Sequence, residues 1–178
     1  QGDCRHCQAK ARRWSRSGPS GRSARFRRAW RLSSSTVRAM SDFTIRMDVS
    51  AEHHMAVARQ RAKSLAESLG MSQSVSFSIA TCASELASNL VFHATSGGVI
   101  AFRGWREGDI ACLEMESTDN GPGIPDVRLA MEDGFSTHGG LGGGMPGLGR
   151  MMDELEVEST VGVGTRIVAR KRERCRLE

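Results

Sequence analysis

From residue 43 onward the hydrophobic residues follow regular patterns. Residues 43–47 alternate between apolar and polar, which predicts a first strand. Two longer segments repeat apolar residues every three or four positions, which predicts two amphipathic helices. We expect the first helix to stop at Gly70, and the second to be capped by Ser74 and to end before Gly97. The apolar stripes are Met55, Ala58, Ala62, Leu65, Ala66 and Leu69 in the first helix, and Val75, Ile79, Cys82, Ala83, Leu86 and Leu90 in the second.

Shorter patterns in the second half predict four strands and two short helices. The first two strands are joined by a turn at residues 106–109. A short helix is expected to begin at Pro125, because proline suits the first helical turn. A second short helix is expected to follow the glycine-rich stretch 139–149 and to end near Glu154. The four predicted strands are 99–105, 110–117, 155–159 and 165–171.

This order of elements favours an α+β fold, with helices layered on a mostly antiparallel sheet, over alternating βαβ units. No apolar run approaches the roughly 18 residues that a membrane helix needs, so a membrane-spanning role is excluded.

The basic residues are concentrated in a leader formed by residues 1–39. The leader carries 11 of the 25 Lys and Arg residues and one of the 20 acidic residues, so the rest of the chain is net negative. We therefore expect no direct nucleic-acid binding by the folded domain. Because the leader is rich in Arg and Ser and lacks apolar periodicity, we expect it to be disordered.

Three interpretations of the leader 1–39 stay open: a nucleic-acid-binding arm, a transit peptide, or upstream sequence translated before a native start at Met40. We favour the third, because the ordered pattern begins directly after Met40. The folded domain is then expected to span 40–172, followed by a charged tail at 173–178.

The five cysteines are scattered and odd in number, which argues against a disulfide framework and fits the reducing cytoplasm. Cys4 and Cys7 have the spacing of half a zinc site, but no second half follows. We expect no zinc site.

Glycine is concentrated where a phosphate group could bind. Twelve of the 20 glycines lie between Asp119 and Thr165, and glycine-rich loops expose backbone N–H groups to anions. A flexible linker is the alternative, but a linker seldom sits between a core strand and a core helix. No P-loop motif is present, and the G-x-G-x-x-G match at 142–147 lacks the preceding strand and the downstream acid of a dinucleotide fold.

Two further groups of polar residues could carry chemistry. Glu85, Asn89 and His93 are four residues apart, so they lie along one side of the second helix. A carboxylate and an amide there can hold a hydroxyl group and a divalent cation, although a solvated polar face has the same spacing. We expect His93 to be a partly buried residue without a catalytic role.

The run DNGPGI at residues 119–124 directly follows a predicted strand. An acid at a strand end can accept a hydrogen bond from an exocyclic amine, and Gly121 and Gly123 leave room for a flat ring. The alternative is an ordinary Pro-Gly turn.

Taken in order, E-x-x-x-N, D-x-G-x-G, a glycine-rich lid and G-x-G-T resemble the GHKL ATPase superfamily over about residues 43–171. Within it the chain looks like the anti-sigma regulatory factors, and most like the stressosome switch kinases. This narrower resemblance depends on DGFST at 133–137, GLGGGMPG at 140–147 and RMMDELEV at 150–157. Leu148-Gly149 departs from the bulkier, basic pair expected before Arg150. The resemblance implies a two-layer α/β sandwich of the Bergerat type, with a mixed, mostly antiparallel sheet.

The same resemblance implies roles for individual residues. Glu85 would be the general base, and Asn89 would coordinate Mg²⁺ that bridges the phosphates of ATP. Asp119 would bind the adenine amine in a pocket shaped by glycines, and Thr165 would form a hydrogen bond near the adenine. The glycines are Gly121 and Gly123 beneath the base, and Gly140, Gly142, Gly144 and Gly147 in the lid around the phosphates.

The resemblance finally implies a cytoplasmic serine/threonine protein kinase that uses Mg²⁺ and ATP in a stress-response pathway of the partner-switching type. Its substrate would be a STAS-domain anti-anti-sigma or scaffold protein, and a PP2C-type phosphatase or a sigma factor would be further partners. The alternative is an anti-sigma factor that sequesters a sigma factor under nucleotide control. Homodimerisation occurs among such kinases and stays open. Ser136 and Thr137 are expected to be loop caps, not phosphate acceptors.

Overall fold

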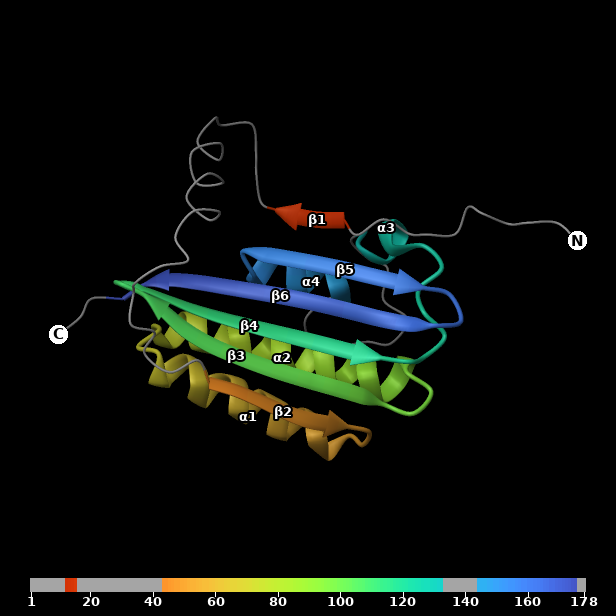
Figure 1. Cartoon of the computed structure of the whole chain (residues 1–178), viewed down its shortest axis with the longest axis horizontal. Coiled ribbons are helices and arrows are strands. Elements are labelled where there is room, and N and C mark those ends of the chain that lie inside the picture. The colour runs from red at the N-terminus through yellow and green to blue at the C-terminus, as the bar shows by residue number, and fades with distance from the viewer. Residues whose placement is uncertain (1–11, 16–42, 133–143, 176–178) are drawn as a thin grey trace, which may run out of the picture.

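The computed structural model of the chain describes residues 12–15, 43–132 and 144–175. Within these ranges, six strands form one sheet in the order β1-β5-β6-β4-β3-β2, and each neighbouring pair runs antiparallel (Figure 1). The strands are β1 (Arg12–Ser15), β2 (Phe43–Val49), β3 (Gly98–Glu107), β4 (Ile110–Asp119), β5 (Glu154–Thr160) and β6 (Gly164–Arg174).

Helices cover one face of this sheet, which confirms the predicted α+β class with its two layers (Figure 1). Strand β4 shows how the sequence builds the covered face, because Leu113 and Met115 are fully buried while Glu114 and Glu116 beside them are only partly buried. The helices are α1 (His53–Ser68), α2 (Gln73–His93), α3 (Val127–Ala130) and α4 (Gly144–Met151). The largest fully buried side chains are Val49, Ile79, Leu86, Leu90, Ile100, Phe102, Leu113, Met115, Leu148, Met152, Leu155 and Val168.

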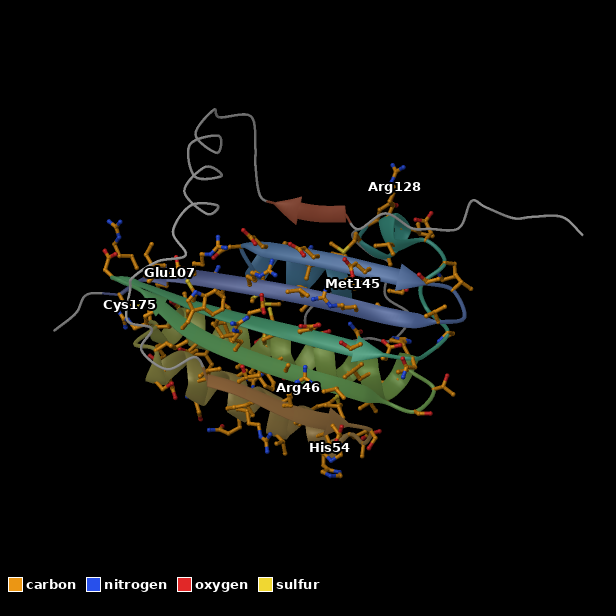
Figure 2. All side chains as sticks on the ribbon, in the orientation of Figure 1. Arg46, His54, Glu107, Arg128, Met145 and Cys175 are labelled. Atoms are coloured by element: carbon orange, nitrogen blue, oxygen red, sulfur yellow. The ribbon has the colours of Figure 1, made fainter. Side chains whose placement is uncertain are left out.

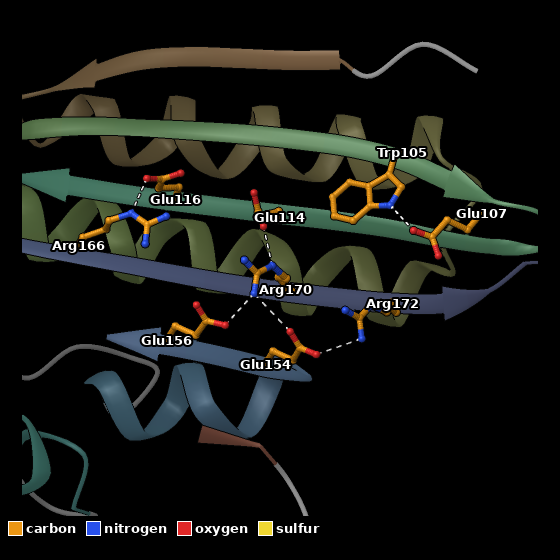
Figure 3. A network of polar contacts seen from close by, with 9 residues as sticks. All are labelled: Trp105, Glu107, Glu114, Glu116, Glu154, Glu156, Arg166, Arg170 and Arg172. Atoms are coloured by element: carbon orange, nitrogen blue, oxygen red, sulfur yellow. Dashed lines mark hydrogen bonds and ion pairs between the residues drawn. The ribbon is translucent and has the colours of Figure 1, made fainter. Parts of the chain in front are cut away.

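The opposite face of the sheet carries a ladder of ion pairs (Figure 3). Arg170 bonds to Glu114 on one neighbouring strand and to Glu154 and Glu156 on the other. Burial opposes the charge of Arg170, but its hydrogen bonds to Glu114 and Glu156 outweigh that effect and raise its pKa. The ladder is extended by Arg166 with Glu116 and Glu158, and by Arg172 with Glu154.

Two predicted helix starts were wrong by two residues. The N-cap of α2 is Ser72, not Ser74: the Ser72 side chain accepts a hydrogen bond from the Val75 N–H, and the Ser72 backbone is extended. The short helix α3 starts at Val127, because Asp126, not Pro125, accepts the N–H groups of the first turn. In both places a side-chain acceptor decides where the helix begins.

The helix after the glycine-rich stretch also differs from its prediction. Part of the stretch is itself helical, since α4 begins at Gly144, and Glu154 is the first residue of β5 instead of a helix end. Glycine has a low helix propensity, but Met145 and Leu148 are buried in the core, and α4 packs against α2. Tertiary packing therefore overrides the local preference.

Helix α2 has the length and apolar character of a membrane span, with 21 residues and a mean hydropathy of 1.3 over an 18-residue stretch. The prediction from apolar runs missed this property, because polar residues interrupt the helix. In the fold α2 contacts α1, α4 and the sheet, and it buries Ile79, Leu86 and Leu90. Its apolar composition matches this position in the core.

The described part of the leader contributes one strand, β1, which pairs with the edge of β5. The remainder of 1–39, including Cys4 and Cys7, lies outside the described residues, so the expected disorder stays a prediction. At the other terminus β6 continues to Arg174, inside the expected tail 173–178, and residues 176–178 are not described.

The two ends of the sheet differ in what they hold. Figure 2 places Glu107 and Cys175 at one end, where the Cys175 N–H donates to the carbonyl of Asp109 at 2.7 Å. Strand β4 runs from this end to Asp119. The predicted site residues that the structure describes lie at the Asp119 end of the sheet, along α2 and in α4.

Candidate nucleotide site

The centre of the candidate site is a buried carboxylate on α2. Glu85 is 9% exposed, and no residue in the described part of the chain forms a hydrogen bond or an ion pair with its side chain. Asn89 follows one turn later, about 6 Å along the helix axis, and is partly buried. Neither of its oxygens is among the described side-chain atoms that are both fully buried and unpaired, so the carboxylate keeps contact with solvent. This carboxylate is therefore available for a ligand.

The last turn of α2 lies against the end of β4. A Cβ atom on Gly98, the residue paired with Asp119, would approach Leu90 Cδ2 at 2.7 Å and Asp119 Cβ at 3.2 Å. A Cβ atom on Gly121 would meet Ala94 Cα at 2.9 Å. The structure therefore brings Asp119 to the C-terminal end of the helix that carries Glu85 and Asn89.

One carboxylate oxygen of Asp119 accepts a hydrogen bond from the loop that follows it, and the other does not. Its Oδ1 accepts the Gly121 N–H at 2.7 Å, which holds the carboxylate in place. The other oxygen accepts no hydrogen bond from any residue within 12–15, 43–132 or 144–175. A fixed carboxylate with a spare acceptor can bind an exocyclic amine.

Glycines make close backbone approaches possible beside this carboxylate. Gly123 has a φ of +72°, and a Cβ atom there would come within 2.3 Å of the Thr160 carbonyl. Gly164 has a φ of +139°, and a Cβ atom there would come within 2.1 Å of the Asp119 carbonyl. A side chain at either position would displace backbone, so these two glycines fix the shape of the loop that follows Asp119.

Three side chains form a row across the strands at this end. Thr165 on β6 lies opposite Asp119 on β4, and Ser159 on β5 lies opposite Thr165. Ser159 is 5% exposed, and its Oγ lies 2.9 Å from Thr165 Oγ1. Sequence reasoning identified Asp119 and Thr165 but missed Ser159. The available signal was a serine at a core-facing position, two residues after Val157 in an alternating strand.

The glycines expected around the phosphates are only partly described. Gly144 opens α4 with a φ of +63°, and Gly147 is buried inside that helix. Both belong to α4, which packs against α2. Gly140, Gly142, Ser136 and Thr137 lie outside the described residues. The N-terminal end of α4 can favour an anion, because its first N–H groups lack helical partners.

A hollow of about 430 Å³ surrounds the Asp119 end of the sheet. By strand alternation, Ser159 and Thr165 face the helices, whereas Glu158 and Arg166 face the open side. The hollow therefore includes both faces. It is lined by Thr118, Asp119, Asn120, Glu158, Ser159, Thr160, Val163, Gly164, Thr165 and Arg166.

Other chemical groups near α2 are poor candidates. His93 is exposed, contrary to the expected partial burial. Burial raises the pKa of the Cys82 thiol to about 12, so it is protonated at neutral pH. Among the described residues, His, Cys, Asp and Glu form no cluster of three or more that could hold a metal ion.

Comparison with known proteins shows which family the chain resembles. Residues 49–171 match the histidine kinase-like ATPase domain. The serine/threonine-protein kinase RsbT of Bacillus subtilis is 44% identical over 124 residues, which are 67% of this chain and 90% of that protein. Anti-sigma F factors of Thermoanaerobacter sp. and of Caldanaerobacter subterraneus are 36% and 38% identical over 92 residues, 49% of this chain and 63% of each factor.

These similarities confirm the superfamily that the ordered motifs predicted, and the matched region contains Glu85, Asn89, Asp119 and Thr165. Because the match covers residues 49–171, the chain belongs to the family of histidine kinase-like ATPase domains.

Proposed function

We propose that this protein is a cytoplasmic serine/threonine protein kinase that transfers the γ-phosphoryl group of Mg²⁺-bound ATP to a partner protein. The observation that carries the proposal is Glu85, a buried carboxylate without a partner in the described structure. The names of its relatives support the same activity, since one is a serine/threonine-protein kinase.

In the proposed site, the base, the phosphates and the reacting γ-phosphate lie in turn along α2. Asp119 accepts a hydrogen bond from the adenine amine at the C-terminal end of the helix. Asn89, closer to the N-terminal end of α2, lies beside the phosphates. Glu85 is one further turn away, about 6 Å from Asn89 along the axis, where the γ-phosphate and the acceptor hydroxyl would meet.

Glu85 acts on the acceptor hydroxyl in this proposal. The carboxylate accepts a hydrogen bond from the incoming Ser or Thr hydroxyl and takes its proton as the bond to phosphorus forms. Phosphoryl transfer depends mainly on positioning and charge neutralisation, so no cysteine or serine nucleophile is needed.

The described residues fit Mg²⁺ only as part of a nucleotide complex. The Asn89 amide oxygen would supply one protein ligand, and the phosphates and water would supply the others, as is usual for this ion. When bound, Mg²⁺ offsets the negative charge of the phosphates. The N-terminal end of α4, with Gly144 and Gly147, would favour the same negative charge.

We assign the protein substrate to the class of STAS-domain antagonists and scaffolds in a partner-switching pathway. A PP2C-type phosphatase or a sigma factor would be a further partner. The second candidate function is a sigma-binding anti-sigma factor, which the similarity to anti-sigma F factors favours. Retention of a sigma factor by the full chain in a pull-down, without phosphate transfer to a STAS protein, would support this second function.

Calorimetric titration of the full chain with ATP, with and without Mg²⁺, tests the site. We expect Asp119→Ala to weaken binding at least about tenfold, because the base loses a hydrogen bond to a charged group. We expect Asn89→Ala to lose the increase in affinity that Mg²⁺ provides. Asp126→Ala is the matched control, since Asp126 only caps α3. Undiminished binding by Asp119→Ala, or no binding by the intact chain, would contradict the proposed site.

A further inference from the structure

Ser159 is a buried hydroxyl group that the proposed mechanism does not use. It lies on the helix-covered side of β5, 5% exposed, at the end of the row that begins with Asp119 and Thr165. It lines the hollow at the Asp119 end of the sheet, where the proposed mechanism gives it no contact with the nucleotide. It contacts Thr165, however, and Thr165 lies next to the proposed base-binding carboxylate.

The hydrogen bonds of Ser159 determine where its one hydrogen lies. Its Oγ accepts the Ile124 N–H at 2.7 Å and donates to the Gly164 carbonyl at 3.2 Å. A carbonyl can only accept, so this bond uses the only hydrogen of the Ser159 hydroxyl. In the remaining contact, 2.9 Å between Ser159 Oγ and Thr165 Oγ1, either hydroxyl could donate, and we assign the donor to Thr165 because the Ser159 hydrogen is directed at the Gly164 carbonyl.

This arrangement leaves Thr165 with lone pairs but no hydrogen for a ligand. An ionised carboxylate such as that of Asp119 is also an acceptor only. Asp119 and Thr165 are directly opposite on neighbouring strands, so this wall of the site offers acceptors alone. It is complementary to a hydrogen-bond donor and not to a carbonyl oxygen.

We propose that Ser159 is a specificity-determining positioning residue, which selects a 6-aminopurine over a 6-oxopurine by holding the Thr165 hydrogen away from the base. Without the Ser159 hydroxyl, Thr165 could turn its hydrogen toward an oxygen on carbon 6 of the purine. The inference depends on the proposed nucleotide site and adds to it the residue that sets base preference.

The test is the ratio of the affinities for ATP and inosine triphosphate, measured by calorimetry with the full chain. We expect the wild type to prefer ATP, and Ser159→Ala to reduce the ratio about tenfold, the size of one hydrogen bond in a buried site. Ser159→Thr keeps the hydroxyl and should keep the ratio. Ser117→Ala is the control, because Ser117 is 3% exposed on the same face and forms no side-chain hydrogen bond to the described residues.

The outcomes separate this inference from the proposed function. If Ser159→Ala weakens both nucleotides equally, or changes neither, Ser159 is only structural and the inference is wrong. A wild type that binds ATP and inosine triphosphate equally also contradicts it. A wild type that binds neither nucleotide instead contradicts the nucleotide site itself.

A measurement without a variant covers the case in which Ser159→Ala does not fold. NMR of the full chain should show a slowly exchanging Thr165 hydroxyl proton with a through-space contact to the Ser159 Cβ protons. A Thr165 hydroxyl proton that exchanges rapidly with water would overturn the inference, since the hydrogen would then not be held by Ser159.

Discussion

The two faces of the sheet treat charge in opposite ways. On the open face, Arg170 contacts three carboxylates (Figure 3). Arg166 contacts two, Glu116 and Glu158. On the covered face, Glu85 is more deeply buried than the carboxylates of this ladder, yet it has no partner among the residues that the structure describes. Glutamates are thus paired on the open face, whereas Glu85 in the helical layer has no partner among the described residues.

The paired charges on the open face stabilise the fold, whereas the Glu85 carboxylate does not contribute a stabilising ion pair. A paired, half-buried charge is stabilised by its neighbours, and removing one partner leaves the others uncompensated. A buried charge without a partner lowers stability and can still bind a ligand. We therefore expect substitutions on the open face to change stability, and substitutions of the covered charges to change activity.

The largest effect should come from Glu85→Gln. We expect phosphate transfer to a STAS-domain protein to fall by roughly 10²–10⁴, the usual contribution of a general base. The free energy of unfolding should not decrease, because a buried charge is replaced by a neutral amide of similar size. Transfer measured with labelled ATP, together with denaturant unfolding, tests both statements.

Glu67→Gln is the control for that experiment, since Glu67 is an exposed carboxylate that pairs with Lys63 on α1. It should leave transfer unchanged. Wild-type transfer by Glu85→Gln would remove Glu85 from the proposed mechanism.

Gly164→Ala should have the next largest effect. Its φ of +139° and the approach of a Cβ atom to 2.1 Å from the Asp119 carbonyl require the backbone at Asp119 to move. We expect a loss of about 2–4 kcal/mol in the free energy of unfolding, from strain and displaced backbone. Binding of ATP should weaken as well.

Gly162→Ala is matched to this change. Gly162 also has a positive φ, +75°, but nothing lies within 4 Å of a Cβ atom there. It should cost only about 1 kcal/mol, the strain of a left-handed alanine. Equal losses from the two variants would show that the contact with Asp119 is unimportant.

Arg170→Met should lower stability with little effect on the site. Three partly buried carboxylates would lose their common partner, and we expect a loss of about 1–3 kcal/mol in the free energy of unfolding. Affinity for ATP should stay within about twofold, which is within the usual effect of a remote surface change. Denaturant unfolding and calorimetry measure the two quantities.

The exposed pair of Arg174 and Asp109 is the control, with side chains 77% and 51% exposed. Arg174→Met should change stability by less than about 0.5 kcal/mol. If Arg170→Met abolished ATP binding while the fold stayed stable, the division between the two faces would be wrong.

The smallest expected effect is a change of stability with pH, caused by one buried cysteine on each side of the sheet. Burial raises the thiol pKa from 9.0 to about 12 for Cys82 on α2, and to about 11 for Cys112 on β4, where Glu107 adds to the shift and Arg172 opposes it. The unfolded chain therefore loses these protons first, so stability falls as pH rises above 9 and toward the folded pKa values.

At pH 10 each thiol should lower the free energy of unfolding by about 1 kcal/mol. Denaturant unfolding at pH 8 and pH 10 measures this change, and Cys82→Ala should reduce the difference between the two pH values. An identical pH dependence in Cys82→Ala would mean that the Cys82 thiol is not shielded as the structure indicates.

Much of the fold follows from the printed sequence. The stripe from Ala58 to Ala66 predicted α1, and the predicted strand 110–117 corresponds to β4. Helix starts were less accurate, because Ser72 and Ser74 are both suitable caps and only the folded backbone distinguishes them. The helical conformation of 144–149 could not be predicted from composition, since it depends on burial of Met145 and Leu148.

Some site residues could also be predicted from the sequence, and others could not. The sequence identified Glu85, Asn89, Asp119 and Thr165 as candidates, because motif spacing is a local property that a chain displays without folding. It did not identify Ser159, which lies 40 residues from Asp119 and reaches the site only through two strand pairings.

By itself, the sequence determined the layered class of the fold, the periodic core and the ordered motifs, all of which depend on spacing along the chain. Only the tertiary structure decided the strand order, the pairing of open-face charges and the burial of Glu85. Those properties depend on contacts between distant segments, and hydrogen bonding and burial act through space.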